Sequence, residues 1–209
     1  MNKRNKRYAI LVIEDDKDYL AFLAKLLRGS GYDVDTADNG QVALSLWRDK
    51  AYDLILTDLR LPKAGVEPSD LVDGRKLINE IKDRIPYTQI IILSGQGRGV
   101  DMIDAINKHV YRYIEKAAED NDYILRTIEE ALRDRDPVLL ALENLLDKEQ
   151  DETIVLSGEH TPTHRQIYDE VKRGTPFGKE YYKGLRDSMI GATTPQESID
   201  DLLGIKGVV

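Results

Sequence analysis

Short apolar runs alternate with helical patterns through the first two thirds of this 209-residue chain. The runs are rich in Ile, Leu and Val, so each predicts a short strand that is buried on both faces. We expect four such strands, at about residues 8–13, 53–57, 88–93 and 111–115, and a fifth strand at about 32–36. Right-handed crossovers between them give an α/β fold, in which helices cover both faces of a doubly wound, five-stranded parallel sheet.

The segments between these runs carry apolar residues at helical spacing. In the first segment Leu20, Leu23 and Leu27 would share one face of a helix. Helices are expected at about residues 17–28, 40–50, 74–85, 100–109 and 121–134.

Composition excludes several classes of protein. Hydrophobic residues make up 41% of the chain and charged residues 33%, which is typical of a soluble globular protein. No apolar stretch approaches the ~18 residues that span a bilayer, so we expect a cytoplasmic protein without a membrane partner. The chain has no cysteine, which excludes disulfides and thiolate metal sites. Its formal net charge of −8 argues against non-specific binding of nucleic acid.

The sequence changes character after residue 135. We expect one α/β domain at residues 1–135, a helical connector at 136–152, and a small, mostly helical domain for output or interaction at 153–209. Three Thr-Pro pairs indicate helix starts in that last region, because threonine caps helices well and proline suits the first helical position. The expected helices lie at about residues 162–173, 176–190 and 195–203.

Polar residues stand where four of the predicted strands end. Glu14 and Asp15 follow the first strand, Asp58 the third, Ser94 the fourth and Lys116 the fifth. A parallel sheet brings the carboxyl ends of its strands to one edge, where ligands bind. These side chains should therefore meet in one crevice, although acids that follow strands can also be solvated turn residues.

Such a group of residues suits a divalent cation together with a phosphoryl group. Magnesium prefers hard oxygen ligands, so Asp15 and Asp58 are candidate direct ligands and Glu14 could act through a bound water. An aspartate can attack a phosphoryl group to form an acyl phosphate. Lys116 would neutralise charge on the phosphoryl oxygens, and the Ser94 hydroxyl could hold another oxygen.

Four stretches of the chain, taken in order, resemble the receiver domain of two-component response regulators, which has the CheY-like version of the flavodoxin-like fold. They lie at residues 10–16, 54–62, 91–95 and 113–116, and the resemblance covers roughly residues 7–135.

The resemblance implies specific roles at the metal and phosphate site. Asp58 would be the phosphoacceptor and Lys116 the residue that contacts the phosphate. Glu14 and Asp15 would position Mg²⁺, with the backbone carbonyl of Arg60 as a further ligand.

The same resemblance implies a switch and a partner. Ser94 would supply the switch hydroxyl and Tyr113 the switch aromatic side chain. A sensor histidine kinase or a phosphotransfer protein would supply the phosphoryl group.

Two departures from the family pattern border the expected site. Ala117 follows Lys116 where the family usually has proline. Eleven residues, 63–73, separate Pro62 from Gly74, which makes this loop longer than is usual.

The C-terminal residues 136–209 hold eight Lys and Arg against fourteen Asp and Glu, a net charge of −6. DNA binding normally needs a basic surface, so we expect the signal to pass to an unknown protein partner, or through a homodimer, rather than to DNA. A DNA-binding transcriptional regulator is the alternative, because a small basic cluster is present at Lys172, Arg173, Lys179, Lys183 and Arg186.

A third hypothesis is an enzyme that uses the same acids, such as a magnesium-dependent phosphatase. Arg60 stands two residues after Asp58, where a second aspartate would be needed, so no general acid is apparent. We therefore expect a phosphoacceptor and not an enzyme.

Overall fold

The computed structural model describes residues 8–59, 61, 74–85, 87–95, 110–116, 120–148 and 162–189. The chain divides into two compact units, Met1–Asp134 and Arg135–Val209. The functional boundaries expected at residues 135 and 152 stay predictions. Several predicted features lie outside the described residues: the helices at about 100–109 and 195–203, the loop at 63–73, Arg60 and Ala117.

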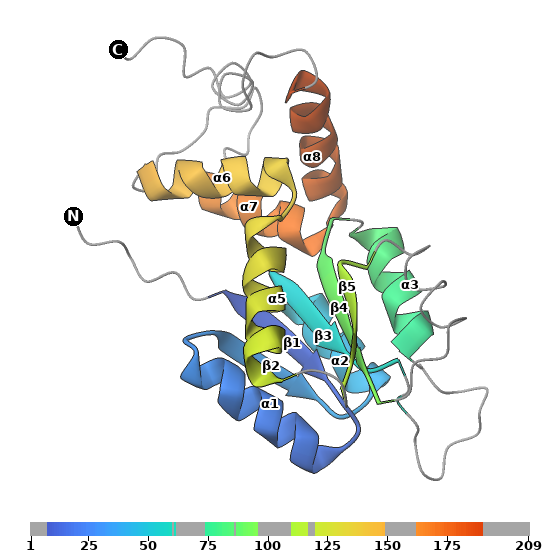
Figure 1. Ribbon diagram of the computed structural model, residues 1–209. Coiled ribbons are helices and arrows are strands. Elements are labelled where there is room, and N and C mark those ends of the chain that lie inside the picture. Colours follow the sequence, from blue (N-terminus) through green and yellow to red (C-terminus); the bar gives the residue numbers. More distant parts are fainter. Residues whose placement is uncertain are drawn as a thin grey trace. The chain divides into compact units, whose positions relative to one another are not determined.

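The first unit contains the predicted parallel sheet. Its strands are β1 (Ala9–Ile13), β2 (Asp33–Ala37), β3 (Leu54–Thr57), β4 (Gln89–Ser94) and β5 (Arg112–Glu115), in the spatial order β2-β1-β3-β4-β5 (Figure 1). All four pairings are parallel. Ile13 pairs with Thr57, so the residues that follow β1 and β3 stand side by side at the carboxyl edge. The predicted α/β fold is confirmed.

The strands differ in burial, and here one expectation was wrong. Every residue of β1 and β3 is buried, as predicted, but in β5 only Ile114 is buried. Arg112 and Glu115 are exposed because β5 lies at the edge of the sheet. An edge strand has a neighbour on one side only and needs less apolar sequence than a central strand.

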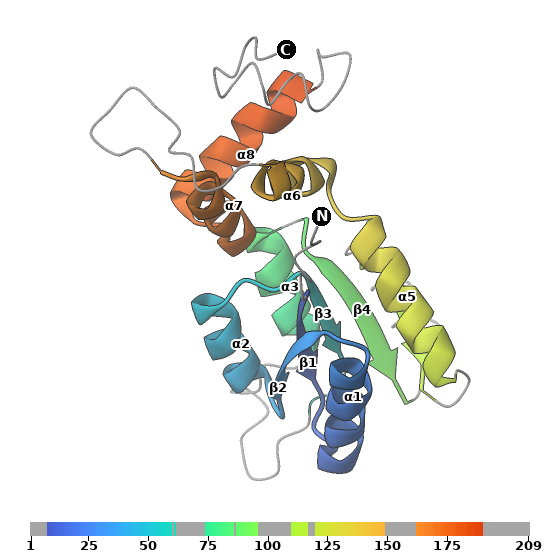
Figure 2. The same cartoon turned by 90° about the vertical axis from the view of Figure 1, so that its left-hand side faces the viewer.

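Four described helices cover the two faces of the sheet. Helices α1 (Lys17–Gly29) and α5 (Asn121–Arg133) lie on one face, and α2 (Gly40–Asp49) and α3 (Gly74–Arg84) on the other (Figures 1 and 2). Alternate residues of β1 point to opposite faces, so Ile10 joins the core under α1 and α5 while Leu11 joins the core under α2 and α3. These two cores fix the sheet from which the site is built.

The second unit is helical where it is described, as predicted. Its helices are α6 (Pro137–Lys148), α7 (His164–Arg173) and α8 (Pro176–Met189). Helix α7 begins at His164 and not at residue 162, because Thr163 forms a capping box with Gln166. A Cβ atom at Gly178 would lie 2.1 Å from the Glu170 carbonyl oxygen, so α7 and α8 pack closely there. In neither unit is a described helix long and apolar enough to cross a membrane.

Candidate functional site

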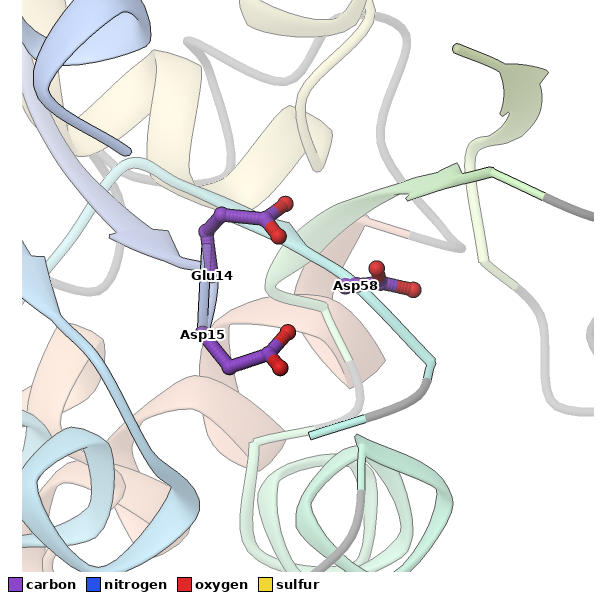
Figure 3. Close-up of side chains that lie close together, drawn as sticks. All are labelled: Glu14, Asp15 and Asp58. Atoms are coloured by element: carbon purple, nitrogen blue, oxygen red, sulfur yellow. The ribbon is translucent and has the colours of Figure 1, made fainter. Parts of the chain in front are cut away.

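Three acids gather at the carboxyl ends of β1 and β3. Glu14 and Asp15 directly follow β1, and Asp58 directly follows β3. The Glu14 N–H donates to the Ala37 carbonyl at 3.0 Å and the Asp58 N–H to the Ile13 carbonyl at 3.0 Å, so the sheet ladder holds both backbones. One ligand oxygen from each of the three carboxylates lies within 4.8 Å of the other two (Figure 3). This spacing allows all three acids to serve one cation.

Lys116 reaches these acids from the end of β5, two strands away from β3 at the same edge of the sheet. Its backbone N–H donates to the Ser94 carbonyl at 2.9 Å, directly after β5. Its Nζ donates to Glu14 Oε2 at 2.5 Å and to Asp58 Oδ2 at 2.8 Å. The side chains of Lys116, Glu14 and Asp58 are 17%, 2% and 10% exposed, so these ion pairs are largely shielded from water. We call Glu14, Asp15, Asp58 and Lys116 the Lys116 cluster.

The Lys116 cluster is short of positive charge. Burial raises the pKa of Glu14, although Lys116 opposes this, and burial likewise raises the pKa of Asp15. Burial disfavours the charged form of Lys116, but hydrogen bonds to Asp58 and Glu14 outweigh it and raise its pKa. Three carboxylates thus share a single ammonium group among the described residues. Their oxygens match the ligands that Mg²⁺ prefers, so the donor set fits that ion.

An aromatic ring that the sequence-based prediction missed lies against the lysine. The Lys116 Nζ lies 4.8 Å from the centroid of the Tyr19 ring. Tyr19 stands in the first turn of α1, where the Asp16 carboxylate caps the helix and accepts the Tyr19 N–H at 3.0 Å. The one available signal was an aromatic residue in the helix that follows the acidic pair.

The predicted switch residues occupy neighbouring strands. Ser94 is the last residue of β4, is buried, and pairs with Glu115 of β5. Tyr113 pairs with Ile92, and its hydroxyl is buried without a hydrogen-bond partner among the described residues. The predicted ligand carbonyl of Arg60 lies outside the described residues. The switch roles of Ser94 and Tyr113 stay predictions.

Gly74 packs against the backbone that carries Asp58. The Gly74 N–H donates to the Leu59 carbonyl at 3.2 Å. A Cβ atom at Gly74 would lie 2.3 Å from the Asp58 carbonyl oxygen and 2.8 Å from the Leu59 Cα. Only glycine allows α3 to begin this close to the end of β3.

A second lysine joins two carboxylates at the opposite, amino edge of the sheet. Lys50 Nζ donates to Asp33 Oδ2 and to Asp35 Oδ2, each at 2.8 Å. The Tyr52 hydroxyl donates to Asp35 Oδ2 at 2.8 Å, and the Tyr52 ring centroid lies 5.5 Å from Lys50 Nζ. We call these four residues the Lys50 cluster.

Comparisons with known proteins agree on the first unit. The model of the response regulator receiver domain matches residues 10–129. The transcriptional regulatory protein ZraR of Klebsiella oxytoca is 33% identical over 107 residues, which are 51% of this chain and 22% of that protein. The curated relatives we compared are thus matched over a fifth to a third of their own length, between 21% and 33%.

Solved structures show the same fold. The signal receiver domain of an HD domain-containing protein from Pseudomonas fluorescens Pf-5 has a TM-score of 0.55 and 28% sequence identity, covering 61% of this chain and 96% of that one. NtrX from Brucella abortus has a TM-score of 0.54 and 29% identity, covering 61% of this chain and 28% of that one.

Proposed function

The chain belongs to the response regulator receiver family, and on that premise we propose that it is a signalling protein controlled by phosphorylation of Asp58. One observation carries the assignment. The Asp58 carboxylate shares a cluster with Glu14 and Asp15 and accepts a hydrogen bond from the Lys116 ammonium at 2.8 Å. A nucleophilic carboxylate, acids for a cation and a fixed positive charge are the parts that phosphoryl transfer to an aspartate requires.

Asp15 and Asp58 would hold Mg²⁺ directly, and Glu14 would hold it through a water molecule. When bound, Mg²⁺ supplies positive charge that neutralises the phosphoryl oxygens during transfer. Lys116 provides a positive charge to these acids and donates to the Oδ2 oxygen of Asp58.

The transfer is a single displacement on phosphorus. An Asp58 carboxylate oxygen attacks a phosphohistidine of a sensor histidine kinase or phosphotransfer protein. The P–N bond breaks, its electrons stay on the histidine, and an acyl phosphate forms on Asp58. Lys116 then donates to a phosphoryl oxygen, and the Ser94 hydroxyl donates to another. Asp58 is an acceptor here and turns over no substrate of its own.

The output is proposed to run through the helical second unit to a protein partner, or through a homodimer. Tyr113 would couple phosphorylation of Asp58 to this output. Its buried hydroxyl has no hydrogen-bond partner among the described residues, which costs free energy that a rearrangement could relieve. A cytoplasmic location, where a histidine kinase presents its phosphohistidine, is part of this proposal.

The acceptor role is tested by adding acetyl phosphate and Mg²⁺ to the full chain and measuring its intact mass. The wild-type chain should gain one phosphate, and Asp58→Asn should gain none. Asp35→Asn is the matched control, because it removes a partly buried acid of the Lys50 cluster, and it should label normally. Equal labelling of Asp58→Asn, or no labelling of the wild type with any small donor, would end the proposal.

DNA binding is the second candidate, and two observations support it. Relatives of the first unit are named transcriptional regulatory proteins, which leaves the expectation that DNA is not a partner unsupported. In the second unit, Lys179, Lys183 and Arg186 are exposed along one side of α8. Such a basic stripe is how a helix contacts DNA phosphates.

The basic cluster is smaller than its sequence suggests. Lys172 is buried, with its Nζ 5.2 Å from the centroid of the Tyr168 ring, and so does not belong to the exposed stripe. The test is selection of duplex genomic fragments by the phosphorylated full chain, repeated with Lys183→Glu. Salt-sensitive retention that Lys183→Glu abolishes supports DNA binding, and retention of no fragment excludes it.

A further inference from the structure

The Lys116 ammonium contacts three groups among the described residues. Two are the carboxylates of Glu14 and Asp58, and the third is the face of the Tyr19 ring, 4.8 Å from Nζ at its centroid. A cation over the face of an aromatic ring is attracted by the electron density of that face, and more strongly so where water is excluded. The ring face is therefore a third attractive contact of the ammonium, in addition to the two carboxylates.

The ring is held in place from two directions. Its backbone is fixed because the Asp16 carboxylate caps α1 and accepts the Tyr19 N–H at 3.0 Å. Its side chain stacks on Phe22, with ring centroids 5.8 Å apart and planes inclined by 24°. Tyr19 also packs against the core under α1 and α5. A ring fixed in this way restricts where the lysine side chain can go.

We propose that Tyr19 is a positioning residue for Lys116, whose ring face holds the ammonium over the acidic cluster so that it meets a phosphoryl group on Asp58. The inference that this position of Lys116 assists phosphate uptake rests on the proposed function. The contact between Tyr19 and Lys116 can be tested without phosphorylation. Lys116 directly follows an edge strand, which has a neighbour on one side only. A long, flexible side chain at such a place loses rotamer freedom when it binds, and the ring confines it beforehand.

The experiment compares substitutions of Tyr19 that separate the effect of the aromatic face from the effect of apolar volume. Tyr19→Phe and Tyr19→Trp keep an aromatic face, whereas Tyr19→Leu keeps apolar volume without one. Tyr32→Leu is the control, because Tyr32 packs on the same core and no contact joins it to the Lys116 cluster. Two quantities are measured on the full chain: the NMR shifts of the Lys116 Cε protons, and the rate of phosphate uptake from acetyl phosphate at saturating Mg²⁺.

Ring current should shift the Lys116 Cε protons upfield in the wild type, in Tyr19→Phe and in Tyr19→Trp, and this shift should vanish in Tyr19→Leu. Uptake should slow about three- to ten-fold in Tyr19→Leu and stay within about two-fold in the aromatic variants, as expected for loss of one cation–π contact. Tyr32→Leu should change neither quantity.

Equal rates for the leucine and phenylalanine variants would overturn the proposal, as would a lysine signal that does not respond to loss of the ring. Should Tyr19→Leu not fold, fluorinated phenylalanines at position 19 replace it, because each fluorine weakens the ring face at nearly constant shape. A stepwise loss of rate with fluorination supports the proposal, and a constant rate opposes it. A wild type that takes up no phosphate would defeat the proposed function, while the NMR shift would still decide the Tyr19 contact.

Discussion

Two clusters in the first unit contain nearly the same side chains, but only one of them is proposed to react. In each, one lysine bridges two carboxylates beside a tyrosine ring, at the carboxyl edge of the sheet in the Lys116 cluster and at the amino edge in the Lys50 cluster. They differ in burial. The lysine is 17% exposed in the first and 38% in the second, and the acids of the Lys50 cluster are 34% and 52% exposed.

The two clusters also differ in the balance between acids and the groups that donate hydrogen bonds to them. The tyrosine hydroxyl of the Lys50 cluster donates to Asp35, and together with Lys50 it outweighs the effect of burial and lowers the pKa of that acid. The Lys116 cluster has a third acid instead of a second donor, and burial raises the pKa of Glu14 and of Asp15. The Lys116 cluster is thus more buried than the Lys50 cluster and has one acid more, and raised carboxylate pKa values of this kind are common at functional sites.

The difference between the two clusters is tested most directly by replacing each lysine. Lys116→Met should slow phosphate uptake at saturating Mg²⁺ by about 100-fold, because a positive charge aimed at the transferring group is lost. Lys50→Met should leave uptake within about two-fold, since its cluster lies at the other edge of the sheet and takes no part in transfer. Time courses of labelling with acetyl phosphate measure both. Comparable losses in the two variants would show that the lysines serve stability alone.

A smaller effect should come from moving Asp58 without changing any charge. Gly74→Ala places a methyl group against the Asp58 carbonyl and should lower the free energy of unfolding by about 1–3 kcal/mol and reduce uptake. Urea unfolding and labelling measure the two effects. In Gly29→Ala, at the end of α1, the new Cβ would meet no atom within 4 Å. That control should be neutral or stabilising by up to ~1 kcal/mol, and a neutral Gly74→Ala would contradict the close approach.

The smallest expected effect is a difference in the sign of the pH dependence. Asp35 has a lowered pKa in the folded chain, so its ionised form stabilises the fold above about pH 4, and this stabilisation is lost as the pH falls through the folded pKa. Asp15 has a raised pKa, so its ionised form costs stability at neutral pH, and the cost disappears as the pH falls toward the pKa of the unfolded chain.

Melting curves in metal-free buffer test this difference. At pH 7, Asp35→Asn should lower Tm and Asp15→Asn should raise it, each by roughly 2–4 °C. The Asp15→Asn difference should shrink as the pH falls toward about 4, whereas the Asp35→Asn difference should persist to about pH 4 and shrink only below it. Added Mg²⁺ should raise the Tm of the wild type more than that of Asp15→Asn. Shifts of the same sign for the two variants at pH 7 would show that the clusters are electrostatically alike.

The sequence predicted those parts of the site that depend on strand ends. Glu14, Asp58 and Lys116 each follow an apolar run, and parallel topology alone brings the ends of such runs to one edge. The contact between Tyr19 and Lys116 could not be predicted in this way, because it joins residues of a helix and a distant strand without a local signal. The burial of β5 was overestimated for a similar reason, since an edge position is a property of the whole sheet.

In the second unit, two local signals competed. The Thr-Pro pair at residues 161 and 162 predicted the start of α7, but the side chains of Thr163 and Gln166 each accept the other residue's backbone N–H and set the start at His164. Helical phase explains the other difference. Lys172 follows Tyr168 by one turn, so its side chain lies along the same buried side of α7 and not among the exposed basic residues.

The lysine that pairs with the acids directly follows β5, one of the two edge strands of the sheet. β5 is laddered to β4 alone and buries one of its four residues, whereas β1 and β3 are buried throughout. When Asp58 gains or loses charge, the change in force on Lys116 therefore acts on a strand that has a neighbour on one side only. A change of charge at the buried Asp58 would thus be converted into movement of an edge strand, whose open side another molecule can contact.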